Sequence, residues 1–166
     1  MSDDTWREGT GLKISQKCLY ALQATMALAR RYQQGAIGVR EIALEGDLPK
    51  KFLALILLEL KHARIVESTR GSKGGYRLRR APSDIHLSEI IRFVDGTLAP
   101  FGDSDQLRSL VASDVTHRTL YQVFLDVRDA AATILENTTV ADLVRAQASP
   151  RSKAREQHPK QQRREA

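Results

Sequence analysis

Apolar positions in the first part of the chain recur at helical spacing and predict three consecutive helices. We expect the first over residues 12–35, ended by Gly35, the second over residues 38–47 and the third over residues 48–64. The apolar stripes expected to face a core are Ile14, Cys18, Leu22 and Met26 in the first helix, Val39, Ile42 and Ala43 in the second, and Leu53, Ile56, Leu57 and Leu60 in the third.

The pattern changes after the third helix and predicts a β-hairpin. Residues 65–69 and 75–80 have the composition of short strands, and the glycine-rich turn 70–74 joins them. Two short helices joined by three or four residues form a helix-turn-helix pattern, which is a weak signal alone. A hairpin directly after the second of these helices completes the order of a winged helix. In that arrangement the helix lies in the major groove of DNA, and the hairpin reaches the backbone or the minor groove.

The hairpin is strongly basic. The stretch RGSKGGYRLRR, residues 70–80, holds five Lys or Arg, three Gly and no acid. Glycines keep a DNA-binding hairpin thin, and cations match the dense phosphates of a duplex. We expect Arg70 to enter a narrow minor groove. We expect Lys73, Arg77 and Arg79 to bind phosphates. A solvated basic hairpin is the alternative. A nucleotide-phosphate loop is disfavoured, because there is no GxxxxGK[ST] motif and no helix follows the glycines.

Composition narrows the class of protein further. The 166 residues suffice for one domain with tails, and no apolar run reaches the roughly 18 residues of a membrane span. The first ten residues lack a signal pattern, so we expect a cytoplasmic protein without a membrane partner. Of the net charge of +6, residues 149–166 carry +4, from six basic and two acidic side chains. We interpret this segment as a disordered basic tail, which serves solubility or touches nucleic acid.

A last amphipathic stretch, residues 119–137, predicts a long helix near the end of the chain. Its apolar side is either ordinary core or a surface for a partner subunit, and a two-fold dimer would set two recognition helices ~34 Å apart. The candidate dimerisation residues are Leu120, Val123, Phe124, Val127, Ala131 and Ile134.

Three segments together resemble the Rrf2-type winged-helix regulators, the bacterial family that contains the IscR, NsrR and CymR groups. They are ISQKCLYALQATMALA, VREIALEGDLPKKFLALILLELKHARIVESTRGSKGGYRL and DIHLSEIIRFVDGTLAP, and RGxKGGYRL is the most specific element. The resemblance covers residues 12–144. It implies a mostly α fold with a small β-hairpin wing. It also implies a homodimer, held together by a long C-terminal dimerisation helix. Each subunit would bind a near-palindromic operator in double-stranded DNA through its winged helix-turn-helix domain. The expected divisions are an N-terminal extension over 1–11, the DNA-binding domain over 12–97, a loop over 98–116, the dimerisation helix with a short terminal helix over 117–146, and the tail over 147–166.

The resemblance also implies DNA-contacting positions. They are Ser15 and Lys17 near the start of the first helix, Lys50 and Lys51 at the start of the recognition helix, and Arg70 and Gly71 at the wing tip. Phe52 also matches a groove-facing position, but we interpret it as a core residue. Where the IscR group reads bases with a glutamate and a glutamine, this chain has Ala54 and Leu55. An IscR-type operator is therefore not expected.

The sequence differs from cluster-binding members of the family in the segment that holds their iron–sulfur cofactor. Cluster-binding members carry three cysteines in the segment that corresponds to residues 97–117, and this chain has none there. Iron–sulfur clusters need thiolates, so we expect no cluster and no metal cofactor. Four residues in this segment could bind a divalent ion weakly, or they are ordinary polar residues of the surface, and we favour the second interpretation. They are Asp103, Asp105, Asp114 and His117. Cys18, the single cysteine, is expected as a buried small side chain rather than a redox sensor.

Three functions follow for comparison. The favoured one is a sequence-specific DNA-binding transcriptional regulator, a repressor, whose effector is open between a small molecule and a protein. The alternative is a protein-interaction or heterodimer module that has lost specific DNA binding, which Ala54 and Leu55 suggest and the basic wing opposes. An enzyme is disfavoured, because the sequence offers no Ser-His-Asp order, metal-ligand spacing or phosphate loop.

Overall fold

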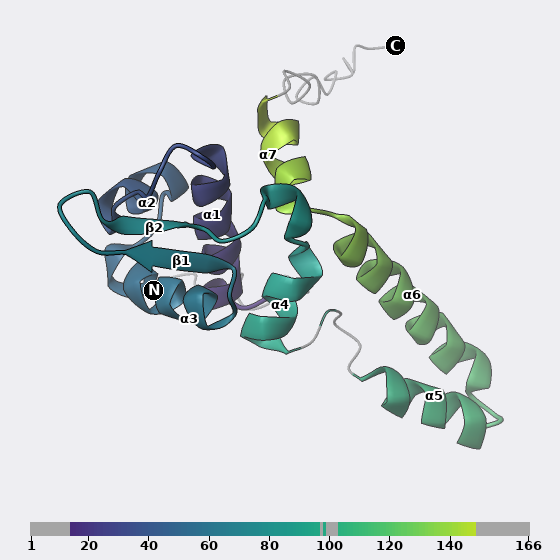
Figure 1. Ribbon diagram of the computed structural model, residues 1–166. Coiled ribbons are helices and arrows are strands. Elements are labelled where there is room, and N and C mark those ends of the chain that lie inside the picture. The colour runs from purple at the N-terminus through teal and green to yellow at the C-terminus, as the bar shows by residue number, and fades with distance from the viewer. Residues whose placement is uncertain (1–13, 97, 99–102, 149–166) are drawn as a thin grey trace, which may run out of the picture.

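The computed structural model describes residues 14–96, 98 and 103–148 of the chain. The helices of the described part are α1 (Gln16–Arg30), α2 (Val39–Gly46), α3 (Lys50–His62), the 3-10 turn η1 (Pro82–Asp84), α4 (Leu87–Asp95), α5 (Ser104–Ser113), α6 (Arg118–Asn137) and α7 (Val140–Ala148), and the strands are β1 (Val66–Thr69) and β2 (Gly75–Leu78). Figure 1 shows a body built from α1 to α4 and the hairpin, and an arm of α5 and α6 that projects away from it. This is the mostly α fold with a β-hairpin that the sequence predicted.

Helix α1 forms the centre of the body, because α2, α3, α4 and α7 all pack against it. Its most buried positions include Ala21, Ala24 and Thr25, and small side chains let neighbouring helices approach closely. The larger residues of the predicted stripe, Leu22 and Met26, are only partly buried at the edge of this core. Helix α1 also ends at Arg30, before the glycine expected to stop it.

Helices α2 and α3 form the helix-turn-helix. Asp47 takes a left-handed conformation at the end of α2 (φ 51°). The next residue, Leu48, is buried and anchors the turn in the core of the body. The predicted α3 stripe of Leu53, Ile56, Leu57 and Leu60 is buried as a whole. This stripe fixes α3 on the body, so the opposite side of the helix faces outward.

The hairpin follows α3 as a two-stranded antiparallel sheet, which we call the wing (residues 66–78). The end of β2 nearest the turn is held by Ile37, which exchanges two backbone hydrogen bonds of 2.9 Å with Tyr76. A Cβ on Gly75 would lie 2.3 Å from the Ile37 carbonyl oxygen, so only glycine permits this contact. At the tip, Gly71 has φ +110°, a conformation that other residues rarely adopt.

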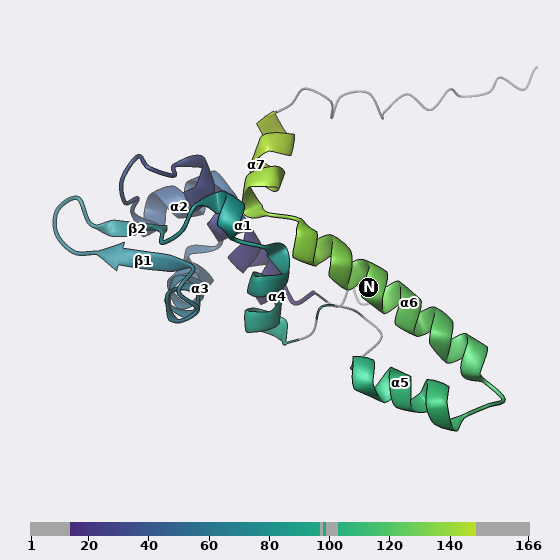
Figure 2. The same ribbon diagram turned by 45° about the vertical axis from the view of Figure 1, so that its right-hand side comes forward.

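The arm is a helical hairpin in which α5 packs against α6, and Figures 1 and 2 show it pointing away from the wing. Residues 104–113 lie within the segment expected as a loop, but they form a helix that Asp103 caps and that buries Leu107. The end of α6 leads into α7, which returns to the body and packs on α1. Val140 donates to the Ile85 carbonyl (2.9 Å) and Leu87 to the Thr138 carbonyl (3.0 Å), which ties the root of the arm to α4.

Two predicted segments fall outside the described residues. These are the N-terminal extension and nearly all of the basic tail, since residues 1–13 and 149–166 are not described. The first two residues of the expected tail, Gln147 and Ala148, instead end helix α7. Among the helices that the structure describes, none has the length and apolarity needed to cross a membrane.

Candidate nucleic-acid interface

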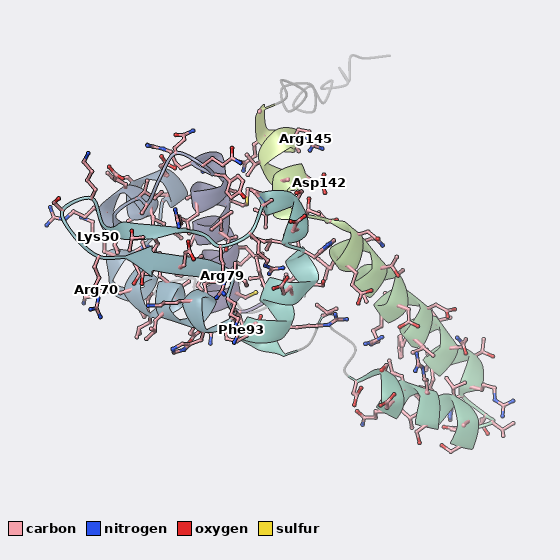
Figure 3. The ribbon with its side chains drawn as sticks, viewed as in Figure 1. Lys50, Arg70, Arg79, Phe93, Asp142 and Arg145 are labelled. Atoms are coloured by element: carbon pink, nitrogen blue, oxygen red, sulfur yellow. The ribbon has the colours of Figure 1, made fainter. Side chains whose placement is uncertain are left out.

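Four cationic side chains around the helix-turn-helix and the wing tip are exposed. Lys50 and Lys51 lie in the first turn of α3, and Arg70 and Lys73 lie in the turn of the wing. Within the described part of the chain, none of the four makes a hydrogen bond or an ion pair. Figure 3 shows Lys50 and Arg70 at the same edge of the molecule, where the wing turn lies. Exposed cations without a protein partner are suited to bind a polyanion.

The two arginines of strand β2 and its end are placed differently. The Arg77 Nε donates to the Glu67 carboxylate across the strand pair at 2.6 Å, so its charge is already matched. Arg79 is exposed, but it lies beyond β2 at the root of the wing, where its backbone N–H donates to the Ile65 carbonyl. Figure 3 places Arg79 near α4 rather than with Arg70. The structure therefore separates both residues from the unpaired cations at the tip.

Lys17, near the start of α1, is also paired. Its Nζ lies 3.3 Å from a carboxylate oxygen of Glu59 on α3. Both side chains are exposed, so the pair is weak and a phosphate can compete for the lysine. Glu59 also places a negative charge beside the outward face of α3, where it would repel DNA.

We expect the substitution Glu59→Gln to raise affinity for duplex DNA by about two- to fivefold at low salt, because it releases Lys17 and removes a repelling charge. Fluorescence anisotropy with a labelled duplex measures the change. The matched control is Asp105→Asn, which removes the same charge from exposed α5 at the far side of the molecule from the wing. An equal gain in both variants would mean that net charge alone is responsible and that Glu59 has no local role.

Ser15 couples the start of α1 to the end of α4. Its hydroxyl accepts from the backbone N–H of Cys18 at 3.0 Å and so caps the helix. The same hydroxyl donates to Asp95, and the Ser15 backbone N–H donates to the second oxygen of that carboxylate at 2.8 Å. A DNA phosphate would have to compete with Asp95 for this serine. No local pattern signals the pair, because eighty positions of sequence separate its two members.

The apolar stripe predicted for dimerisation lies along one side of α6. No described segment covers it: Leu120, Val123 and Val127 are about half exposed, and Ile134 is 65% exposed. Phe124 and Ala131 of the same stripe are partly buried. The residues of α6 that are buried, Leu125 and Ala132, lie roughly a third of a turn away, on the side that faces the rest of the chain.

Comparisons with known proteins show to which family this fold belongs. Residues 14–146 match the model of the Rrf2 family, described as iron-dependent transcriptional regulators. The chain belongs to the Rrf2 family. An rrf2-like HTH-type regulator of Rhodobacter capsulatus is 47% identical over 90 residues, which span 52% of this chain and 60% of that relative. The HTH-type regulator CymR of Bacillus subtilis is 31% identical over 132 residues, covering 80% of this chain and 89% of CymR. The solved structure of B. subtilis CymR, the global cysteine regulator, superposes with a TM-score of 0.70 at 29% identity, over 81% of this chain and 98% of that one.

Membership in the Rrf2 family confirms the resemblance and the winged-helix fold, and it makes this protein a DNA-binding transcriptional regulator and not an enzyme. The winged-helix fold and the regulatory function were both expected from the sequence. The residues that sequence reasoning missed are the acids Glu59, Glu67 and Asp95, each of which engages a predicted DNA-contacting residue. Of these, Glu67 could have been found from the strand register, which sets it directly opposite Arg77.

The donor groups of this Rrf2 regulator do not fit an iron site of the thiolate type. Cys18 is the single cysteine of the chain, and it is fully buried in the core beneath the start of α1. Burial, and secondly the charge of the Asp95 carboxylate, raise the pKa of the Cys18 thiol to about 12, so it is neutral at neutral pH. Within the described residues no three His, Cys, Asp or Glu side chains gather as a metal-binding group.

Two of the acids considered above as metal ligands or surface polar residues, Asp103 and Asp114, have structural partners. Asp114 accepts hydrogen bonds from the ring Nδ1 of His117 at 2.9 Å and from its backbone N–H at 3.1 Å, and these bonds lower the pKa of the Asp114 carboxyl. Asp103 caps α5 by accepting from the Asp105 backbone N–H. Both acids therefore stabilise the turns that shape the arm.

Proposed function

We propose that this regulator binds an operator in duplex DNA as a homodimer, with α3 in the major groove and the wing tip at the minor groove. The observation that carries the proposal is the set of four unpaired cations, Lys50 and Lys51 at the start of α3 and Arg70 and Lys73 in the turn of the wing. Their charge matches phosphates on both sides of a groove. The stripe of α6 supports the dimer, because Leu120, Val123, Val127 and Ile134 are about half exposed or more, and exposed apolar side chains gathered on one helix face are typical of an interface.

The biological action that we propose is repression. A dimer that covers a near-palindromic operator occludes any promoter that overlaps it, and DNA binding alone suffices for this effect. The residues that we assign to DNA are Ser15, Lys17, Lys50, Lys51, Arg70, Gly71 and Lys73, with Arg77 and Arg79 further from the tip. Because this Rrf2 chain lacks the ligands of a thiolate-held cluster, we propose that its activity does not depend on one. We expect it to act in the cytoplasm, where bacterial DNA lies.

One observation favours a second candidate, a module that binds a protein. A groove between α1 and α3 is lined mainly by the apolar side chains of Tyr20, Phe52, Leu55 and Ile56, together with the polar Gln16, Lys17 and Glu59. Phe52 was interpreted from the sequence as a core residue, yet more than half of it is exposed. An apolar groove of this kind is a common feature of peptide-binding surfaces.

The two candidates are separated by selection from a randomised duplex pool with the full chain. The proposed function predicts enrichment of a near-palindromic sequence. The variant Arg70→Ala should then bind the selected duplex about tenfold more weakly and lose preference for A·T pairs under the wing. In transcription with purified polymerase, a promoter carrying the selected site should be silenced by the protein. A pool that yields no enriched sequence would favour the protein-binding candidate.

A further inference from the structure

The outward face of α3 is unexpectedly apolar for a helix that enters a DNA groove. The side opposite the buried stripe presents Lys51, Leu55 and Leu58, at the i, i+4 and i+7 spacing of one helix face. Leu55 is 62% exposed and Leu58 is 45% exposed. Ala54 lies beside them and is also exposed. Two leucines that face water on a well-packed body suggest that this face is covered when the protein acts.

The charges around this face indicate what covers it. Lys50 and Lys51 stand at its start, Lys17 stands beside it, and Lys61 follows at its far end, with the Lys61 Nζ bonded to Ser68 of the wing. Glu59 is the one acid in α3, and Lys17 already pairs with it. An apolar strip bordered by cations is complementary to a polyanion that carries apolar groups between its charges. It is poorly matched to a purely apolar peptide.

The floor of the major groove offers one such apolar group. Thymine displays its 5-methyl there beside its O4 acceptor, whereas the other three bases carry no methyl group. From Lys50 to Leu58, the exposed side chains of α3 are two lysines and the apolar Phe52, Ala54, Leu55 and Leu58. Lysines can bind phosphates without reading sequence. Within this stretch no short polar side chain remains to read a base edge.

We propose that Leu55, supported by Ala54, is a specificity-determining residue that reads thymine through contact with its 5-methyl group in the major groove. This inference rests on the proposed function, and it adds the chemistry of base selection. It implies that α3 recognises its half-site by apolar contact rather than by hydrogen bonds. Burying one methyl group against Leu55 should improve affinity by about fourfold for each half-site.

The test uses the full chain and the duplex selected from the randomised pool. Each thymine is replaced, symmetrically in both half-sites, by deoxyuridine, which lacks the methyl group and keeps the base-pairing groups. We expect one or two symmetric positions at which uracil weakens binding by about fourfold per half-site. The variant Leu55→Ala should bind the thymine duplex more weakly and should no longer distinguish it from the uracil duplex.

The matched control is Leu44→Ala, which removes an exposed leucine from α2, where 79% of the side chain faces solvent. It should keep the full preference for thymine. Equal binding of thymine and uracil duplexes at every position, by the wild type and by Leu55→Ala alike, would overturn the inference while leaving the proposed function standing, since the selected duplex is still bound. A Leu55→Ala variant whose change lies in oligomeric state, measured by sedimentation, would assign this face to a second copy of the chain and overturn it too. Failure to select any duplex would remove the proposed function itself.

Discussion

The substitution Val127→Glu should convert the protein to monomers and weaken operator binding by at least about a hundredfold. Val127 lies in the middle of the exposed stripe of α6, between Val123 and Ile134, and is 47% exposed. In a two-fold dimer the substitution occurs twice, and each glutamate would be buried without a partner charge. The two half-sites of the operator would then be bound by separate monomers, which lose the effective concentration that a dimer provides.

Sedimentation equilibrium measures the dimer, and fluorescence anisotropy measures operator binding. The control is Thr133→Glu, which introduces the same charge at an exposed position of α6 well away from the stripe. It should leave both measurements unchanged. Circular dichroism should show an intact fold in both variants, because neither residue is buried in the described structure. If Val127→Glu stays dimeric and binds the operator normally, the stripe of α6 is not the dimer interface.

A second large effect is expected from salt. If the dimer neutralises about six to ten phosphates, the logarithm of the binding constant should fall with the logarithm of salt concentration at a slope of roughly −5 to −9. Affinity should then drop by about a thousandfold or more between roughly 50 and 200 mM salt. The physical reason is that each neutralised phosphate releases a counterion, and added salt opposes this release.

A substitution in the wing measures how much the wing contributes to the salt dependence of DNA binding. Lys73→Ala removes one cation from each wing tip, so the slope should become shallower by about 2 for the dimer. Arg108→Ala is the control, because it removes one positive charge from exposed α5, far from the wing. Its slope should match that of the wild type. Identical slopes for all three proteins would show that Lys73 does not touch a phosphate, and a flat salt dependence would contradict the whole interface.

The parts of the fold that could be predicted are those encoded by neighbouring residues. The stripe of α3 was predicted residue by residue, because a helix that packs on one side repeats its large apolar residues every three or four positions. The wing was predicted with its turn at residues 70–74, because strand patterns and glycines are local signals as well. The core of α1 was predicted less well. This helix is surrounded on several sides, so its closest contacts use alanines, which carry no strong periodic signal.

The interface was less predictable, because pairs of distant residues decide which charges are free. The sequence assigns Lys73, Arg77 and Arg79 alike to phosphates, and only the strand register reveals that Glu67 already binds Arg77. Lys17 and Glu59 meet because α1 crosses α3, and this crossing is a property of the packed body. Helix α5 was missed for a related reason: it buries only Leu107 in the described structure and depends on α6 for its stability.

The arm is attached to the body at two points of the chain, after α4 and before α7. The second attachment is reinforced where Leu87 and Val140 bond across it and where Arg92 pairs with Glu136. These contacts hold the end of α6 against α4, so they restrain the direction of α6 relative to the body. In a two-fold dimer, the distance between the two recognition helices would then be set by the fold. The base sequence of an operator could therefore vary more freely during evolution than the spacing between its two half-sites.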